Sequence, residues 1–177
     1  KASKTFDLPR SVDDAVGALY TYVDNTDADN PAKVVAYFEC RLLPDEVNAL
    51  ITLLAVDPKI YGDELPLWED LLGGIEVDGS GKADTSDKGE DKGEEQIEVE
   101  GTTFVGPYFG FAVTYDDQVW TAQDLSDGGN DFLDLSSELA FGTVIAFDAP
   151  YDGASCIETL VSLKQGEGVS GFDVASD

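Results

Sequence analysis

Residues 33–42, KVVAYFECRL, are the stretch that most clearly indicates the fold of this chain. Apolar side chains alternate through it at Val34, Ala36, Phe38, Cys40 and Leu42, which places them on one face of an extended segment. The β-branched and aromatic residues of the stretch also favour a strand over a helix. The sequence therefore predicts a strand over residues 33–42.

Helices are predicted on both sides of this strand. Ser11 is a candidate N-cap for an upstream helix, and Pro44 suits the first turn of a downstream one. A third, shorter helix is predicted over Asp63–Leu72 and ends at the two glycines that follow. The apolar positions of the first two helices are Val12, Val16, Leu19 and Val23, and Val47, Leu50, Ile51 and Leu54.

Two segments without regular structure complete this half. Residues 1–10, KASKTFDLPR, are predicted to form a short extended arm in which Phe6 and Leu8 lie one residue apart. Residues 76–100 include DGSGKADTSDKGEDKGEE, which has no large apolar residue, and predict a solvated linker or long loop.

The pattern after residue 100 changes to strands followed by one helix. Alternating positions predict a strand through Phe109–Tyr115, short strands at 119–121 and 132–135, and a longer one through Phe141–Phe147. A last helix begins at Asp152 or Ser155. The prediction is an α+β fold, with a helix-rich N-terminal region (11–75), an acidic linker (76–100), and an antiparallel sheet with a packed helix (101–177).

Charge excludes several classes of function. Lys and Arg together number 10 against 37 Asp and Glu, so the formal net charge is −27. Binding to nucleic acid or to an anionic lipid surface requires the opposite balance. A salt-loving host, cations held on the surface, and a merely very soluble secreted protein are three explanations of this charge.

The absent residue types point to an exported protein without catalytic machinery. The chain contains neither Met nor His, so we expect a processed N-terminus, and no Ser-His, Cys-His or HExxH set can form. No apolar run is long enough to span a membrane. Cys40 and Cys156 are the two cysteines, and export predicts that they form a disulfide; two buried free thiols are the alternative.

The segment YFGFAVTYDDQVW (Tyr108–Trp120), with the predicted short strands and terminal helix that follow, resembles the core of PsbP-type secreted domains. The resemblance covers residues 108–163. It implies an antiparallel sheet flanked by helices and a role in binding or assembly. Asp116-Asp117-Gln118 stands where that family usually has a Pro before the Trp turn.

Two acidic segments are candidate calcium sites. Asn25, Asp27 and Asp29 offer oxygen ligands at alternate positions, as the start of a calcium loop does, but Ala36 stands where the bidentate Glu would be. The alternative is an Asp- and Asn-rich turn at a helix exit. Asp127, Asn130 and Asp131 surround Gly128-Gly129, and the alternative there is a hairpin loop with solvated acids.

These observations predict a non-enzymatic, exported structural subunit of an extracellular, cell-surface or virion-surface assembly, such as a filament, sheath or coat. The arm carrying Phe6 and Leu8 would add a strand to the sheet edge of another copy, and cations, including Ca²⁺, would screen the acidic surface. The alternative is a monomeric secreted module of PsbP-like fold that binds a ligand or protein on its sheet.

Overall fold

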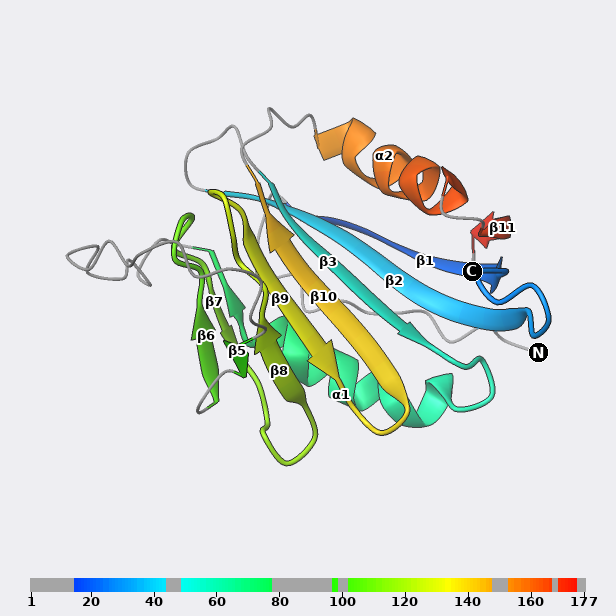
Figure 1. Cartoon of the computed structure of the whole chain (residues 1–177), viewed down its shortest axis with the longest axis horizontal. Coiled ribbons are helices and arrows are strands. Elements are labelled where there is room, and N and C mark those ends of the chain that lie inside the picture. The colour runs from blue at the N-terminus through cyan, green and yellow to red at the C-terminus, as the bar shows by residue number, and fades with distance from the viewer. Residues whose placement is uncertain are drawn as a thin grey trace.

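The computed structural model of the chain describes residues 15–43, 49–77, 97–98, 102–147, 153–166 and 169–174. Two antiparallel sheets and two helices make up this part of the chain (Figure 1). The elements are β1 (Ala15–Asp24), β2 (Ala32–Leu42), β3 (Ala49–Val56), α1 (Tyr61–Gly73), β4 (Ile75–Glu76), β5 (Ile97–Glu98), β6 (Thr103–Val105), β7 (Ala112–Thr114), β8 (Thr121–Asp124), β9 (Asp131–Ser136), β10 (Ala140–Ala146), α2 (Gly153–Gly166) and β11 (Ser170–Val174).

The larger sheet joins the two halves of the sequence. Its strand order is β11-β1-β2-β3-β10-β9-β8-β5, and a smaller sheet has the order β4-β7-β6. At the centre of the larger sheet β3 pairs with β10, from Ala140↔Val56 to Ala146↔Leu50. Strands from residues 15–56 and from residues 121–146 therefore share one hydrogen-bonded sheet.

The predicted first helix is wrong, because Val16, Leu19 and Val23 belong to strand β1. β1 pairs with β2 along its whole length, from Ala15↔Arg41 to Asp24↔Ala32. The helical spacing of its valines and leucine is coincidental, and its Tyr and Thr content suits a strand. Ser11 and Val12 lie outside the described residues.

The predicted second helix is also wrong, because Leu50, Ile51 and Leu54 belong to strand β3. Residues 50–56 are buried without exception, since layers cover both faces of this central strand. A strand that is buried on both faces has a continuous run of apolar residues. Such a run has no alternation that would distinguish it from a buried helix. Pro44 and Val47 lie outside the described residues.

The prediction of an α+β fold with a helix-rich N-terminal half is therefore wrong. That half contributes three long strands and the single helix α1 to a mostly β architecture. The strand at 33–42, the third helix and the last helix are confirmed as β2, α1 and α2, and the strands at 132–135 and 141–147 as β9 and β10.

The strand predicted through Phe109–Tyr115 is shorter than expected. Residues 107–109 form a turn and Gly110 has a φ of 72°, so the strand β7 begins only at Ala112. The piece predicted at 119–121 is likewise a turn over 117–119, after which β8 begins at Thr121. Most of the predicted linker at 76–100 lies outside the described residues.

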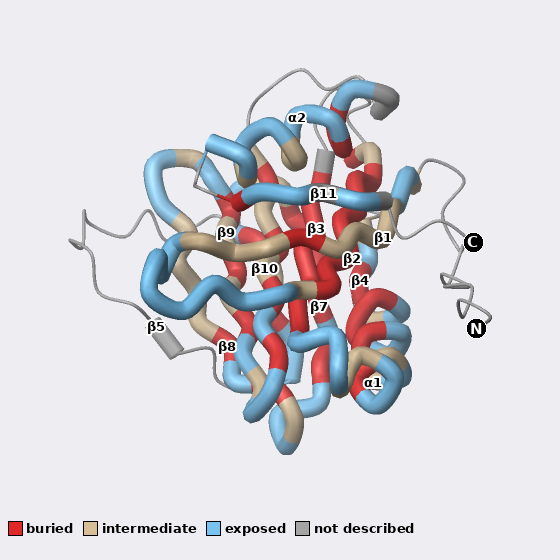
Figure 2. The backbone as a smooth tube through the Cα atoms, turned by 90° about the vertical axis from the view of Figure 1, so that its right-hand side faces the viewer, coloured by how far each residue is buried: buried red, intermediate tan, exposed pale blue. Residues whose placement is uncertain are grey.

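The two helices cover opposite faces of the larger sheet (Figure 2). On what we call the α1 face, Tyr37, Leu54 and Val144 pack with Trp68 of α1 and with Phe111 of the segment before β7. On the α2 face, side chains of β1, β2 and β3 pack with Cys156 and Ile157 of α2. Because successive side chains of each strand point to opposite faces, the larger sheet contributes side chains to two separate cores.

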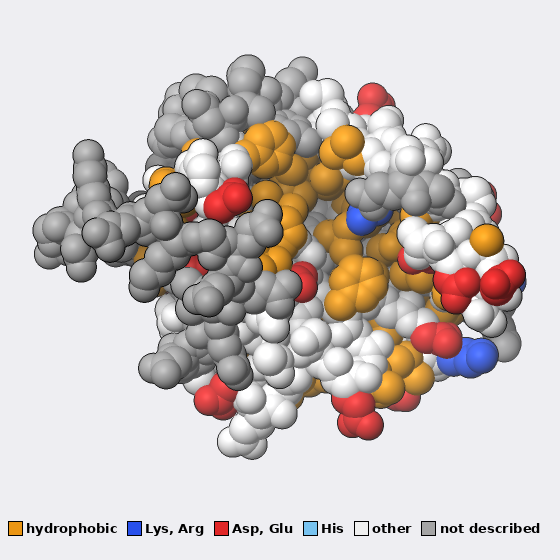
Figure 3. Space-filling model, in the orientation of Figure 1, with side chains coloured by type: hydrophobic (Ala, Val, Ile, Leu, Met, Phe, Trp, Pro, Cys, Tyr) orange, Lys and Arg blue, Asp and Glu red, His pale blue; other side chains and the backbone are white. Residues whose placement is uncertain are grey.

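Helix α2 covers only part of its face. It contacts β1 and β2, whereas β10 and β9 extend beyond it. In Figure 3, which views this face, hydrophobic side chains gather beside α2 over the neighbouring strands.

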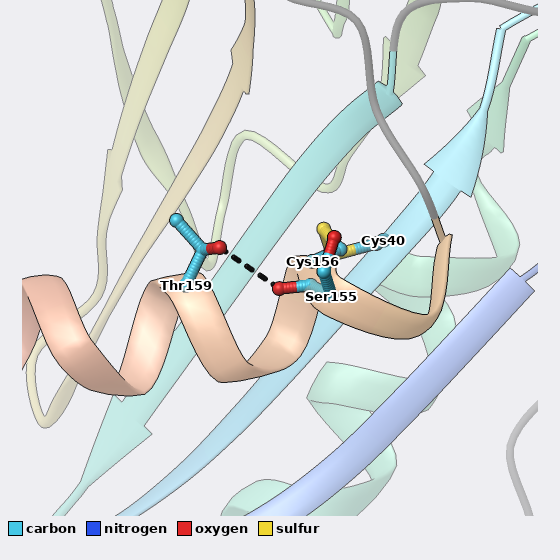
Figure 4. The surroundings of a disulfide bond; sticks show 4 residues. All are labelled: Cys40, Ser155, Cys156 and Thr159. Carbon is cyan, nitrogen blue, oxygen red and sulfur yellow. Dashed lines mark hydrogen bonds between the residues drawn. A yellow bond between two sulfur atoms is a disulfide. The ribbon is translucent and has the colours of Figure 1, made fainter.

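A disulfide holds α2 on the sheet. Cys156, at the end of the first turn of the helix, bonds to Cys40 of β2, with a Cα–Cα distance of 6.4 Å (Figure 4). The predicted pairing is confirmed. Because 116 positions separate the two residues, the cross-link contributes about 4–5 kcal/mol to stability if the chain-entropy account holds.

A buried ion pair holds α1 on the other face. Arg41 of β2 is 2% exposed, and its Nε donates to Glu39 Oε1. The remaining guanidinium nitrogens donate to the carbonyl oxygens of Leu72 (2.8 Å) and Ile75 (2.9 Å), and the Tyr37 hydroxyl donates to Glu39 Oε2 (2.8 Å). Helix α1 has no basic residue in its last turn, so Arg41 supplies the positive charge that a helix C-terminus favours.

We expect Arg41→Met to lower the free energy of unfolding by about 3–5 kcal/mol, because Glu39 is then buried without a counter-charge. Urea denaturation followed by circular dichroism measures this change. Adding Glu39→Met should recover part of the loss, whereas Lys59→Met, which removes an exposed cation, should be almost neutral. Equal effects of Arg41→Met and Lys59→Met would contradict this role for the ion pair.

Candidate functional site

The outer edge of β1 is only partly covered by the next strand of the larger sheet. Within the part of the chain that the structure describes, the strand β11 pairs with Tyr20, Thr21 and Val23, and the register shifts between Thr21 and Val23. Among the described residues, no strand pairs with the outer side of residues 15–19. Their outward N–H and C=O groups therefore form a template for an additional strand.

Val16 marks this edge with an exposed apolar side chain. It lies opposite Cys40 on the α2 face and is 45% exposed, although Cys40 itself is buried. An added strand would cover Val16 by cross-strand contact. At the opposite edge of the sheet, β5 already pairs with Gln123 and Asp124 of β8. The predicted arm residues Phe6 and Leu8 lie outside the described residues.

The first predicted calcium segment forms the hairpin loop between β1 and β2. Asp27 accepts hydrogen bonds from the Asp29 N–H (3.0 Å) and the Asn30 side chain (3.0 Å), and these bonds lower the pKa of the Asp27 carboxyl group. Asn25 donates to Ser170 of β11 at 2.8 Å. This amide thereby ties the loop to β11, and the Asp29 side chain is exposed.

The second predicted calcium segment forms the hairpin between β8 and β9. Gly128 and Gly129 have φ values of 54° and 96°, as a type I′ turn requires, and Asp127 and Asn130 exchange backbone hydrogen bonds across it. Asp127 and Asn130 are exposed. This hairpin lies at the opposite end of the sheet from the β1–β2 loop, so the structure does not bring the two predicted segments together (Figure 1).

Asp131 holds a turn of the adjacent layer. Its side chain is fully buried, and its two carboxylate oxygens accept hydrogen bonds from the backbone N–H groups of Tyr108 (2.9 Å) and Phe109 (2.8 Å). A Cβ at Gly106 would collide with this carboxylate, so only glycine fits there. No local signal in the sequence links residue 131 to the turn at 107–109.

Burial raises the pKa of Asp131, since desolvation outweighs the two N–H donors, and Asp124 adds to the shift. A raised folded-state pKa means that this carboxyl group favours the folded state most at low pH, below its unfolded pKa of about 3.9. That contribution is lost as the pH rises through the raised value.

One shallow acidic cleft was not anticipated from the sequence. It has a volume of about 550 Å³ and lies at the C-terminal end of α1, where the segments 69–74 and 114–116 meet. Its acidic lining residues are Glu69, Asp70 and Asp116. Within the described ranges, no three or more His, Cys, Asp or Glu side chains are arranged to hold a metal ion.

No known protein family, curated protein or solved structure matches this chain. The two described helices are both too short and too polar to cross a membrane. The β1 edge and the apolar area beside α2 are the two candidate functional surfaces of this protein.

We expect Asp131→Asn to lower the free energy of unfolding by about 1–3 kcal/mol at neutral pH, because the amide nitrogen would face a backbone N–H donor. Asp127→Asn is the matched control in the same hairpin and should be almost neutral. Both are measured by urea denaturation in EDTA, so that bound cations do not contribute. Equal stability of the two variants would contradict the role assigned to Asp131.

Proposed function

We propose that this protein is an exported, non-enzymatic structural subunit that assembles with copies of itself by strand addition. The observation that supports the proposal most directly is the unpaired outer edge of β1 at residues 15–19, with Val16 exposed beside it. Backbone hydrogen bonds would give such an assembly its affinity, and alternate side chains its register.

The arm at residues 1–10 is the proposed donor strand. Phe6 and Leu8 are separated by one residue and would therefore point to the same side of an extended strand, as Val16 and Ala18 do on β1. An aromatic side chain opposite a β-branched one is a favourable cross-strand pair. Pro9 has no N–H group and would end the pairing.

Charge also favours the arm as the donor. With three basic side chains and one acidic, residues 1–10 carry a net charge of +2, whereas the remainder of the chain carries −29. The arm would therefore be attracted to the acidic body of another copy. The two bodies repel one another, so we propose that assembly requires cations or high ionic strength.

Removing residues 1–9 should abolish assembly while the far-ultraviolet circular dichroism spectrum stays unchanged. Val16→Lys should have the same effect, because a lysine at a strand edge opposes the addition of another strand. Tyr108→Lys introduces the same charge at another exposed hydrophobic residue, which belongs to the turn before β7, and serves as the control. Sedimentation velocity and negative-stain electron microscopy give the readout, and assembly by either of the first two variants would contradict the proposal.

Calcium is proposed as one of the cations that permit assembly. At fixed ionic strength, EDTA should dissolve the assembly or lower the melting temperature, and about 1 mM Ca²⁺ should restore it. Asp27→Asn and Asp127→Asn would each weaken the calcium response if the two predicted segments bind the ion. Complete substitution of NaCl for Ca²⁺ would show that screening alone suffices.

A further inference from the structure

The α2 face carries an apolar area that α2 leaves open. Registers across β3, β10 and β9 place Ile51, Ile145 and Phe132 in one row, and Ala55, Phe141 and Ser136 in another. Between them Leu53, Thr143 and Asp134 form a third row. We use the name open patch for five residues of these rows on β10 and β9, namely Phe132, Asp134, Phe141, Thr143 and Ile145.

The residues of the open patch are partly or fully exposed, whereas the residues of β3 beside them are buried. Phe141 is 47% exposed, whereas Ala55 and Leu53, its neighbours on β3, are buried. Leu163 of α2 is 60% exposed and lies about 140° around the helix from Glu158, whose charge acts on Tyr20 of β1. Leu163 therefore lies on the flank of α2 that faces away from Tyr20 of β1.

One polar pair lies in the middle of the open patch. The Thr143 hydroxyl donates to Asp134 Oδ1 at 3.2 Å, and both residues are half-buried. Nothing in the described part of the chain donates to Asp134 Oδ2. The patch thus offers an apolar floor with one carboxylate oxygen available as an acceptor, which suits a cationic group beside bulky apolar side chains.

The dimensions fit one more helix beside α2. A sheet face is stably buried only against another layer, and α2 supplies that layer over β1 and β2. The strands β3, β10, β9 and β8 span about 14 Å at the usual strand spacing. One α-helix, about 10 Å across, would cover them.

We propose that the open patch binds an amphipathic helix of a partner protein, one with an apolar stripe and basic flanks. The net charge of −27 favours a basic partner and disfavours a second copy of this chain on the same patch. This inference is independent of assembly at the β1 edge, which lies on the far side of α2. Binding would follow the helix-in-groove mode, with Phe141 and Leu163 on either side of the bound helix.

The probe is a fluorescently labelled synthetic peptide of Leu and Lys, about 18 residues long and patterned as an amphipathic helix. Its control has the same composition but no apolar stripe. Fluorescence anisotropy against the full chain in about 0.15 M NaCl should show saturable binding of the patterned peptide only. Phe141→Ser removes an apolar anchor and should weaken binding about tenfold or more. Asp134→Asn removes the charge partner of the peptide and should weaken binding by about a few fold.

Tyr108→Ser removes an exposed aromatic residue away from the patch and should leave binding unchanged. Circular dichroism of Phe141→Ser verifies the fold, and Phe141→Leu should retain most of the affinity. Equal binding of both peptides, or equal binding to Phe141→Ser, would reduce the effect to net charge and overturn the proposal. Two further outcomes would also overturn the proposal. If removal of residues 1–9 raises the affinity for the peptide, the arm is the occupant of the open patch. If Phe141→Ser changes the oligomeric state and the chain does not bind the peptide, the occupant is a second copy of this chain.

Discussion

The buried Arg41–Glu39 pair is the constraint on which the layered structure depends. Arg41 is removed from water, and its desolvation is offset by one carboxylate and by two carbonyl oxygens at the end of α1 and the start of β4. Helix α1 has no basic residue in its own last turn, so the cation at these carbonyl oxygens comes from Arg41 of β2. The pair therefore fixes where α1 ends and where the smaller sheet begins.

Cys40, between these two residues, fixes the layer on the other side. Because successive side chains of a strand point to opposite faces, Glu39 and Arg41 face α1 while Cys40 bonds to Cys156 of α2. One tripeptide of β2 thus anchors both helical layers. The polar anchor and the covalent anchor differ physically, since the first depends on exclusion of water and the second on oxidation of two thiols.

The two surfaces that this arrangement leaves exposed are the ones proposed to bind partners. α2 is held over β1 and β2, so it cannot also cover β10 and β9, and Phe141 stays exposed. β11 pairs with only part of β1, so residues 15–19 keep an open edge. On a chain of charge −27, both surfaces favour partners that bring positive charge, whether the arm of another copy or a basic helix.

The sequence by itself determined the strand at 33–42, the helices α1 and α2, the strands β9 and β10, and the disulfide. These follow from local periodicity and from the number of cysteines, which can be recognised without knowing which segments are neighbours. Only the tertiary structure decided that residues 15–24 and 49–56 are strands, because pairing with β2 and burial on both faces outweigh their helical spacing. It also decided that Asp131 holds a distant turn, and that Val16 and Phe141 are exposed. Each of these features depends on which segments pair across the sheet, and the local sequence does not show which distant segments pair.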